Sequence, residues 1–274
     1  MPEKHKMRAD VALVERGLAP SREKAQAMIM AGDVYLDEIQ VRKASFPVDE
    51  TANLIVRAPK LTFVSRGALK LQKGLAAFAV DPAGLVAMDM GASTGGFTDV
   101  LLQGGAAHVY AIDVGYGQLD WKIRNDPRVT VMERTNARYL TPEDLPLHPT
   151  LGVMDVSFIS ITKILPAVFP ILGEHGRMIT LIKPQFEAGR DRVGKKGVVR
   201  DAAVHEDVIR SVLSFINTQT DWHCEDLTFS PIRGPEGNIE FLAYLLPGRG
   251  GLDAESEIIP GVVREAHEAL EKEA

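Results

Sequence analysis

Short apolar runs separated by amphipathic stretches fill most of this chain beyond residue 65. The runs cover residues 85–90, 107–112, 129–132, 151–154 and 178–182. Brief apolar runs bounded by turn signals predict buried strands, and stretches with apolar residues on one helical face, such as residues 205–217, predict helices. Alternating strands and helices are typical of an α/β fold around a mostly parallel sheet.

Residues 1–57 show a different pattern and predict a small separate domain. Residues 9–16 form one expected helix, which Gly17 ends, and Ser21 caps a second helix that stops at Gly32. Short strands are expected at residues 34–36, 39–41 and 54–56. Such a module has only a small hydrophobic core.

The same patterns divide the rest of the chain. A linker is expected at residues 58–64, where Pro59 interrupts the strand pattern. The large domain is expected at residues 65–248. Residues 249–274 form an acidic tail with helical propensity, interrupted by Pro260. The expected order is therefore small domain, linker, large domain and tail.

Composition limits the environment of the protein. A chain of 274 residues, 45% of them hydrophobic, is long enough for a sizeable core. The single cysteine, Cys224, excludes an intrachain disulfide framework, suits a reducing compartment and is expected to be a small buried hydrophobe. No apolar run approaches the roughly 20 residues of a membrane-spanning helix, and the polar N-terminus does not resemble a signal peptide. We therefore expect a cytoplasmic protein.

Residues 85–98 carry the clearest ligand-binding pattern and read L-V-A-M-D-M-G-A-S-T-G-G-F-T. The small residues leave backbone N–H groups and a helix start uncovered at the end of a strand, where open α/β sheets bind ligands. A dinucleotide-binding loop has glycine at the middle position of G-x-G-x-x-G, but Ser93 occupies that position here. Its side chain would crowd a diphosphate, so the loop favours S-adenosylmethionine (SAM).

Charged residues follow several of the predicted strands. They are Asp89, Asp113, Asp155 and Lys183. A lone acid at a strand end more often caps the next turn. Because the carboxyl ends of parallel strands share one edge of the sheet, we expect these four groups to line a single crevice. Asp113, about 20 residues beyond the glycine-rich loop, is placed to accept the ribose hydroxyls of either kind of cofactor.

Several longer motifs together resemble the TlyA family. The start M-R-A-D-V-A-L-V-E-R-G-L-A-P-S-R-E-K-A resembles the S4 RNA-binding domain. The motifs D-M-G-A-S-T-G-G-F-T, A-I-D-V-G-Y-G-Q, R-T-N-A-R, D-V-S-F-I-S and L-I-K-P-Q-F-E-A-G-R follow in the order found in FtsJ-like methyltransferases. TlyA proteins, once labelled haemolysins, combine these two domains and methylate ribose 2′-hydroxyls in ribosomal RNA.

The resemblance implies a fold. It is a Rossmann-like class I SAM-dependent methyltransferase domain, with a mostly parallel seven-stranded sheet whose last strand is antiparallel. A small α+β S4 domain precedes it. If the strand at residues 238–245 is the antiparallel one, Glu240 at its beginning lies at the same sheet edge as Asp155 and Lys183.

The resemblance also implies a catalytic tetrad. FtsJ-like enzymes use Lys-Asp-Lys-Glu, and the motif matches place it at Lys70, Asp155, Lys183 and Glu240. A hydroxyl is a poor nucleophile and must lose its proton as it attacks the methyl group. Lys183 is expected to activate the 2′-hydroxyl and Asp155 to hold that lysine, while Lys70 and Glu240 position the hydroxyl. A second lysine and partial desolvation would lower the lysine pKa as this role requires.

For Lys70 and Glu240 of this tetrad, an ordinary solvent-exposed position is the alternative. Lys70 and Lys73 lie one turn apart on a predicted helix, where two lysines are usually solvated. Glu240 could likewise face water from its strand.

The residues expected to contact SAM come from the loop, the strand ends and the family motifs. They are Asp89, Gly91, Ala92, Ser93, Gly95, Gly96, Phe97, Asp113, Val114, Asn136 and Asp155. Asn136 lies in R-T-N-A-R, where the family contacts the adenine, although an asparagine that only makes a turn would fit the same pattern.

The residues expected to contact RNA lie in both domains. They are Arg8, Ser21, Arg22, Lys24, Arg42, Lys43, Arg66, Arg190 and Lys195. The net charge of −6 opposes general nucleic-acid binding, so the placement of a few cations must supply the affinity. For each cation, a solvated surface charge is the alternative. Residues 187–201 predict a basic mobile loop, whereas Asp37-Glu38 replaces the usual Asn-Gly of the S4 hairpin and makes its tip a poor RNA contact.

The sequence thus predicts a SAM-dependent 2′-O-methyltransferase that acts on ribose, of cytidine, in 16S or 23S ribosomal RNA or both. Its expected partners are ribosomal RNA or ribosomal subunits, with no membrane, and we expect a monomer. The alternatives are a membrane-active haemolysin and a non-catalytic RNA-binding factor. The histidines and Cys224 show no metal-ligand spacing, so no metal is expected.

Overall fold

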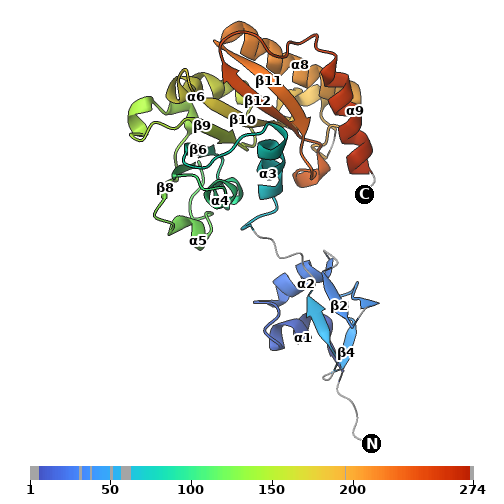
Figure 1. Cartoon of the computed structure of the whole chain (residues 1–274). Coiled ribbons are helices and arrows are strands. Elements are labelled where there is room, and N and C mark those ends of the chain that lie inside the picture. The colour runs from blue at the N-terminus through green and yellow to red at the C-terminus, as the bar shows by residue number, and fades with distance from the viewer. Residues whose placement is uncertain are drawn as a thin grey trace, which may run out of the picture. The chain divides into compact units, whose positions relative to one another are not determined.

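The computed structural model describes residues 6–30, 33–37, 39–49, 52–56, 63–194 and 196–271. The chain divides into two compact units, residues 1–62 and residues 63–274 (Figure 1). The expected helix stop at Gly32, most of the expected linker, Glu38 of the hairpin and Lys195 lie outside the described residues.

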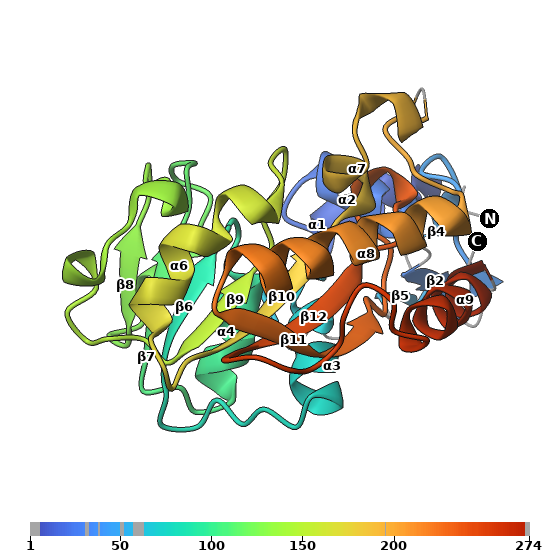
Figure 2. The same ribbon diagram turned by 90° about the horizontal axis from the view of Figure 1, so that it is seen from above.

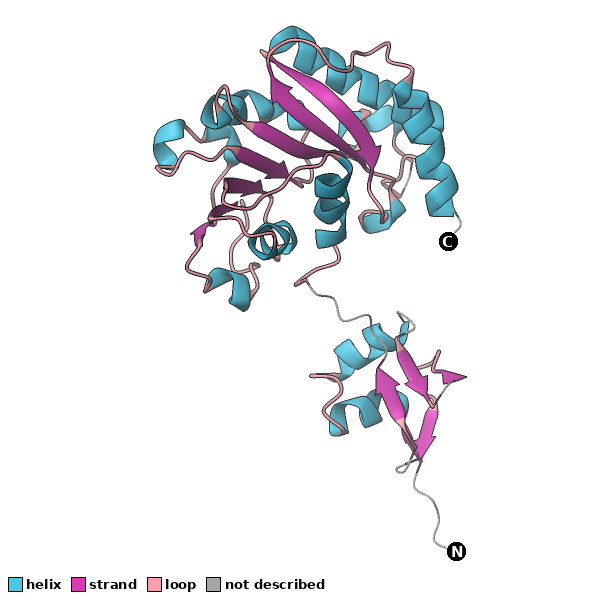
Figure 3. Ribbon diagram, viewed as in Figure 1, coloured by secondary structure: helices cyan, strands magenta, loops and turns pink. Residues whose placement is uncertain are grey.

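The first unit combines two helices with short antiparallel strands (Figure 3). Its elements are β1 (Lys6–Arg8), α1 (Ala9–Glu15), α2 (Arg22–Met30), β2 (Val34–Leu36), β3 (Ile39–Gln40), β4 (Pro47–Asp49) and β5 (Leu54–Val56). Apolar residues of both helices and three strands, among them Leu13, Ile29 and Val48, form its core. The sequence pattern missed the β1–β4 pair, because each strand has a single apolar position between charged residues or proline and so forms no apolar run.

The second unit is built on a seven-stranded sheet in the order β11-β12-β10-β9-β6-β7-β8. The strands are β6 (Val86–Met90), β7 (His108–Ile112), β8 (Val129–Met132), β9 (Leu151–Met154), β10 (Arg177–Ile182), β11 (Trp222–Phe229) and β12 (Phe241–Pro247). Strands β6 to β10 are parallel, whereas β12 runs antiparallel to both β10 and β11. The predicted fold class is confirmed.

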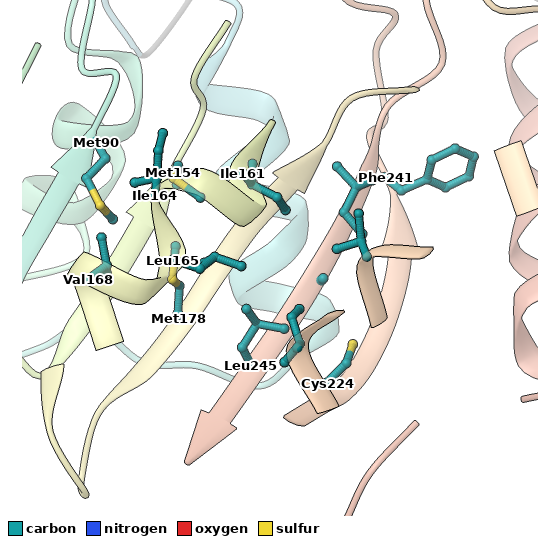
Figure 4. Close-up of a cluster of buried hydrophobic side chains, with 14 of the residues drawn as sticks. Met90, Met154, Ile161, Ile164, Leu165, Val168, Met178, Cys224, Phe241 and Leu245 are labelled. Atoms are coloured by element: carbon teal, nitrogen blue, oxygen red, sulfur yellow. The ribbon is translucent and has the colours of Figure 1, made fainter. Parts of the chain in front are cut away.

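Helices cover both faces of this sheet (Figure 2). They are α3 (Ala68–Ala77), α4 (Gly96–Gln103), α5 (Trp121–Arg124), α6 (Leu165–Leu172), α7 (Pro184–Glu187), α8 (Ala202–Gln219) and α9 (Ile258–Glu271). Short 3₁₀ turns are η1 (Ala137–Tyr139), η2 (Pro142–Asp144), η3 (Ile161–Lys163), η4 (Arg190–Arg192) and η5 (Pro235–Gly237). One core lies under α3, α4 and α5, and a second lies under α6, α8 and α9. In the second, Met154 and Met178 of the sheet lie beside Leu165 of α6 (Figure 4).

The strand order places a ligand crevice at the carboxyl end of β6. Strands β7 and β8 extend the sheet on one side of β6, and β9 and β10 extend it on the other. The chain therefore leaves β6 and β9 in opposite directions, and open α/β sheets bind their ligands at such a switch point.

The acidic tail differs from its sequence pattern. Helix α9 runs through Pro260 without the expected interruption, because proline is tolerated in the first turn, where its missing N–H is not needed. Its residues Ile259, Val263 and Leu270 are buried and join the core that also contains α8 and β11. Residues 258–271 are therefore part of the packed second unit.

Candidate active site

Four charged side chains meet at the carboxyl edge of the parallel strands. Asp155 directly follows β9, Lys183 directly follows β10, and Lys70 lies on α3. Glu240 directly precedes the antiparallel strand β12, and Phe241 of β12 pairs with Ile182 at the end of β10. Because β12 runs in the opposite direction to β10, its start and the strand ends lie at the same edge, as the sequence predicted.

The four groups alternate in charge. Lys183 Nζ lies 2.5 Å from Asp155 Oδ1, and Lys70 Nζ lies 3.3 Å from Asp155 Oδ2. Lys70 Nζ also lies 2.6 Å from Glu240 Oε2. Lys70, Lys183 and Glu240 are buried, and only Asp155 keeps appreciable exposure, with 19% of its side chain accessible. Two positive and two negative groups balance, which is what such a buried cluster requires.

The two lysines of the cluster have different surroundings. Burial alone would lower the pKa of Lys70, but the carboxylates of Asp155 and Glu240 outweigh it and raise that pKa above its usual range. Lys70 is thus a fixed ammonium. Lys183 has Asp155 as its carboxylate partner in the described structure and donates to Ser157 Oγ over 3.1 Å.

Close backbone packing holds Glu240 and the start of the glycine-rich loop. A side chain at Gly234 would overlap the Glu240 carboxylate, so only glycine fits beside it. Gly91 has a φ of 83°, and a Cβ there would lie 2.6 Å from the carbonyl oxygen of Asp155. Sequence reasoning missed Gly234; its signal was the motif G-P-E-G-N-I-E just before the last strand.

The loop from Gly91 to α4 is tied to Asp113. The Ser93 N–H donates to Asp113 Oδ2 over 2.8 Å, and the Gly115 N–H donates to Asp113 Oδ1 over 2.7 Å. Ser93 itself has a φ of 48°, so this position is left-handed even without glycine. Each carboxylate oxygen can accept a further bond, so Asp113 remains able to bind hydroxyl groups.

Two adjoining cavities open at this edge. The larger, of about 470 Å³, is lined by predicted cofactor residues, namely Gly91, Ser93, Asp113, Val114, Asn136 and Asp155. The smaller, of about 210 Å³, is lined by Lys70, Lys183, Ala92, Gly96, Phe97 and others. Gly91, Ser93, Asp155 and Ser157 line both, so the two cavities share a wall at the charged cluster. Gly95, with a φ of 96°, caps α4 and packs near Leu119.

Asp89 lies beneath the loop and has no exposed surface, so it does not line the crevice as expected. It is one residue short of the end of β6 and accepts a bond of 2.7 Å from Thr98 Oγ1 on α4. Burial raises its pKa to about 7; the Thr98 bond opposes this shift, and the charges of Asp155 and Asp113 add to it. Its role in the structure is to join strand and helix behind the loop.

Asn136 makes a turn and lies at the larger cavity. Its Oδ1 accepts the Arg138 N–H over 3.1 Å, as a turn-forming asparagine does, and it also lines the larger cavity. Val114 is 71% exposed at the rim of that cavity.

The residues expected to bind RNA are not all free cations. Arg8 and Arg22 both pair with the buried Asp10, and Ser21 Oγ accepts the Lys24 N–H at the start of α2. Exposed side chains without an acidic partner in the described structure are those of Lys24, Arg42, Lys43, Arg66 and Arg190. Sequence reasoning did not single out Asp10.

A third cavity, of about 660 Å³, adjoins the cavity of about 470 Å³ through Phe158 and Ile159. Its lining includes the cationic residues Arg138, Lys163 and Arg190 together with Phe186. Phe158 is 91% exposed with a φ of 66°, an unusual conformation for an aromatic residue. Part of the expected mobile loop packs nearby: Val198 and Val199 are buried, and the Val199 N–H donates to Asn238 Oδ1 over 3.0 Å.

Comparison with known proteins agrees with this geometry. Residues 63–246 match the FtsJ-like methyltransferase family, and residues 7–54 match the S4 domain. The 16S/23S rRNA (cytidine-2′-O)-methyltransferase TlyA of Mycobacterium tuberculosis is 48% identical over 241 residues, which cover 87% of this chain and 89% of that protein. The chain belongs to the TlyA family.

Two further relatives match over nearly the whole chain. The Bacillus subtilis protein YqxC is 50% identical over 271 residues, covering 97% of this chain and 96% of YqxC. A solved structure from Streptococcus thermophilus, described as a hemolysin, has a TM-score of 0.79 and 43% identity over 98% of each chain. The likeness to TlyA proteins therefore includes both units of the molecule.

Two features are absent from the described residues, a membrane-spanning helix and a metal-binding cluster. None of their helices has the length and apolar character needed to cross a membrane. Nor do they contain a group of His, Cys, Asp and Glu side chains placed to hold a metal ion.

Proposed function

We propose that this protein transfers a methyl group from SAM to the 2′-hydroxyl of a ribose, that of a cytidine, in ribosomal RNA. The observation that carries the proposal is the alternating chain of Lys183, Asp155, Lys70 and Glu240, whose first three members line the smaller cavity. A hydroxyl placed at this wall has a base, fixed charges and a methyl donor within one site.

The residues around the larger cavity suit SAM. Asp113 has free acceptor capacity for the ribose hydroxyls, and Gly91, Ser93 and Asp155 line the same cavity. Val114 and Asn136 at the rim would contact the adenine. When bound, SAM supplies an electrophilic methyl group on a positively charged sulfur.

Lys183 is the base in this proposal. Lys70 has two carboxylate partners that raise its pKa and keep it charged, whereas Lys183 has one carboxylate partner and the Ser157 hydroxyl, so we assign the proton transfer to Lys183. The ribose oxygen forms the new bond to the methyl carbon as the carbon–sulfur bond breaks, and the hydroxyl proton passes to Lys183 Nζ. Asp155 and Ser157 orient that amine, and Lys70 and Glu240 hold Asp155 in place.

Charge balance favours this assignment. When Lys183 is neutral, the four-residue cluster carries one net negative charge. The sulfonium of the donor offsets that charge before the transfer. After the transfer, the donor is neutral and Lys183 is again positive, so the site has a compensating charge at both stages.

The third cavity supports an RNA substrate. Arg138, Lys163 and Arg190 provide positive charge for phosphates, and the exposed Phe158 offers a ring on which an unpaired base can stack. The S4 unit adds the exposed cations Lys24, Arg42 and Lys43. With ribosomal RNA as substrate, we propose that the protein acts as a monomer in the cytoplasm.

Transfer of labelled methyl from SAM to ribosomal RNA or subunits from a strain lacking the protein tests this function. Wild-type protein should label a cytidine 2′-oxygen, and Lys183→Ala should lower the rate by at least about a hundredfold, as loss of a general base implies. Lys73→Ala, one turn from Lys70 and outside the cluster, is the matched control and should retain activity.

Normal transfer by Lys183→Ala would refute the catalytic assignment. If the wild type binds ribosomal RNA but transfers no methyl, and Lys183→Ala preserves its cellular role, the protein is a non-catalytic RNA-binding factor. Release of dye from sealed lipid vesicles by the purified protein, without methyl transfer, would instead support a membrane-active haemolysin.

A further inference from the structure

A buried carboxylate lies at the centre of the basic residues of the first unit. Asp10 is in the first turn of α1, and its side chain is completely buried. It accepts bonds from Arg8 Nε at 2.9 Å and from a terminal nitrogen of Arg8 at 3.1 Å. It also accepts bonds from Arg22 at 3.2 Å and from Gln26 Nε2 at 2.9 Å. Three side chains from β1 and α2 thus converge on one carboxylate.

The two arginines are held only on their inner side. The side chain of Arg8 is 48% exposed and that of Arg22 is 59% exposed. A terminal nitrogen of each lies within 3.2 Å of the same oxygen, Asp10 Oδ2, so the two guanidinium groups are close neighbours. Two positive groups at this separation repel unless an anion lies between them. In the described structure, Asp10 is the anion that brings them together.

Arg8, Arg22 and Asp10 together carry one net positive charge. Its outward-facing N–H groups can still donate, since a guanidinium has five donors and Asp10 occupies only some of them. The Asp10 N–H donates to the carbonyl of Ala44, so the loop that carries the exposed Lys43 is fastened to the same helix start. This arrangement matches a single phosphodiester, which carries one negative charge and several acceptor oxygens.

We propose that Asp10 is a positioning residue that holds Arg8 and Arg22 as a two-armed clamp for one RNA phosphate. This inference rests on the RNA substrate of the proposed function. Asp10 touches no RNA itself; it fixes two flexible side chains in advance, so that less conformational freedom is lost on binding. The Arg8 bond outweighs the effect of burial and keeps the pKa of Asp10 well below its usual range, so the clamp is assembled throughout the neutral pH range.

The effect of an added positive charge on RNA affinity distinguishes a positioning role of Asp10 from general electrostatic attraction. Asp10→Asn makes the protein one unit more positive and, through charge alone, would tighten RNA binding. Loss of the clamp has the opposite effect. We expect Asp10→Asn in the full-length protein to weaken binding to protein-free ribosomal RNA about tenfold, as loss of one charge-assisted hydrogen bond implies. The slope of log affinity against log salt should decrease by about one.

Glu23→Gln is the matched control. It adds the same charge on an exposed position of α2, next to Arg22, and should leave RNA binding unchanged or tighter. In methyl transfer, Asp10→Asn should raise KM for RNA with little change in kcat, while SAM binding stays the same. A purely structural role in the fold would instead lower the amount of folded protein without altering the salt slope.

If Asp10→Asn does not fold, Arg8→Lys decides the question. It keeps the charge but loses the bonds from Nε and the second terminal nitrogen to Asp10, so it should also weaken RNA binding and reduce the salt slope. Unchanged or tighter binding by folded Asp10→Asn, or unchanged binding by Arg8→Lys, would overturn the clamp. Methyl transfer by the wild type reports separately on the proposed function, because a wild type that binds RNA without transferring methyl leaves the clamp intact.

Discussion

Residues of the same type at similar places in the sequence have different tasks in this site. Asp89, Asp113 and Asp155 all follow or end apolar runs, and the apolar pattern alone does not distinguish them. Asp155 contacts both lysines, Asp113 holds the glycine-rich loop, and Asp89 is enclosed behind it. The difference depends on which face of the strand each side chain takes and on the helix that covers that face, which only the folded chain determines.

The enclosed carboxyl of Asp89 leads to a pH prediction. Burial raises its pKa from 3.8 to about 7. Between these values the folded protein holds the proton more often than the unfolded chain does, so the stability it contributes is greatest at low pH and is lost as pH rises toward 7. Asparagine is neutral throughout and can still accept the Thr98 bond. Asp89→Asn should therefore gain stability relative to the wild type from about pH 5 to about pH 8.

Urea unfolding of both proteins at the two pH values measures this difference. Thr98→Val, which removes the donor to Asp89, is a useful companion, since it should raise the pKa of Asp89 further. A stability difference between Asp89→Asn and the wild type that stays constant with pH would contradict the prediction.

Elements were predicted where apolar residues mark them and missed where charged residues or proline interrupt the apolar run. The strand at residues 151–154 and the helix around residues 205–217 were confirmed as β9 and within α8. The three-residue strands β1 and β4 were missed, because their pairing is set by contacts with α1 and by the loop after β3. The tail was predicted as a helix, but its attachment depends on buried residues such as Val263, which meet a surface that sequence periodicity cannot identify.

Helix α9 offers a test of that attachment. Gly261 lies inside the helix, and a Cβ there would meet no atom within 4 Å. Gly261→Ala should therefore stabilise the helix, by up to about 1 kcal/mol. Because α9 shares a core with α8 and β11, the gain should appear as a higher temperature of global unfolding of the second unit by calorimetry.

A helix that frayed independently of the sheet would give no such increase. Gly173→Ala is the contrasting control: it also meets open space, but its φ of 67° is strained for alanine, so it should destabilise.

The molecule as a whole carries its charge unevenly between the two units. Residues 1–60 contain ten Lys or Arg against nine Asp or Glu, so the rest of the chain holds all of the excess negative charge. An acidic catalytic unit repels RNA at long range, and affinity must come from placed cations in the S4 unit and around the third cavity. The sequence predicted this division through its motifs. It could not predict that Asp10 pairs with two of those cations.

Salt should therefore weaken the binding of RNA much more than the binding of SAM. Raising potassium chloride from about 50 to about 200 mM should weaken ribosomal RNA binding at least about tenfold, since several phosphate contacts are lost to counterions. SAM binding, which the proposed function assigns to Asp113 and backbone groups, should change little. Fluorescence titration of each ligand measures both effects, and equal salt dependence for the two would contradict this division of labour.

The position of β12 gives the protein a built-in order of assembly. This strand lies between β10 and β11, and it brings Glu240 to Lys70 across a separation of 170 residues in the chain. During synthesis, every other member of the cluster leaves the ribosome before Glu240 does. A nascent chain that has folded its parallel strands can hold a cofactor loop but not the completed cluster. The newly made enzyme therefore gains its full activity only after residues 241–247 have left the ribosome and β12 has entered the sheet between β10 and β11.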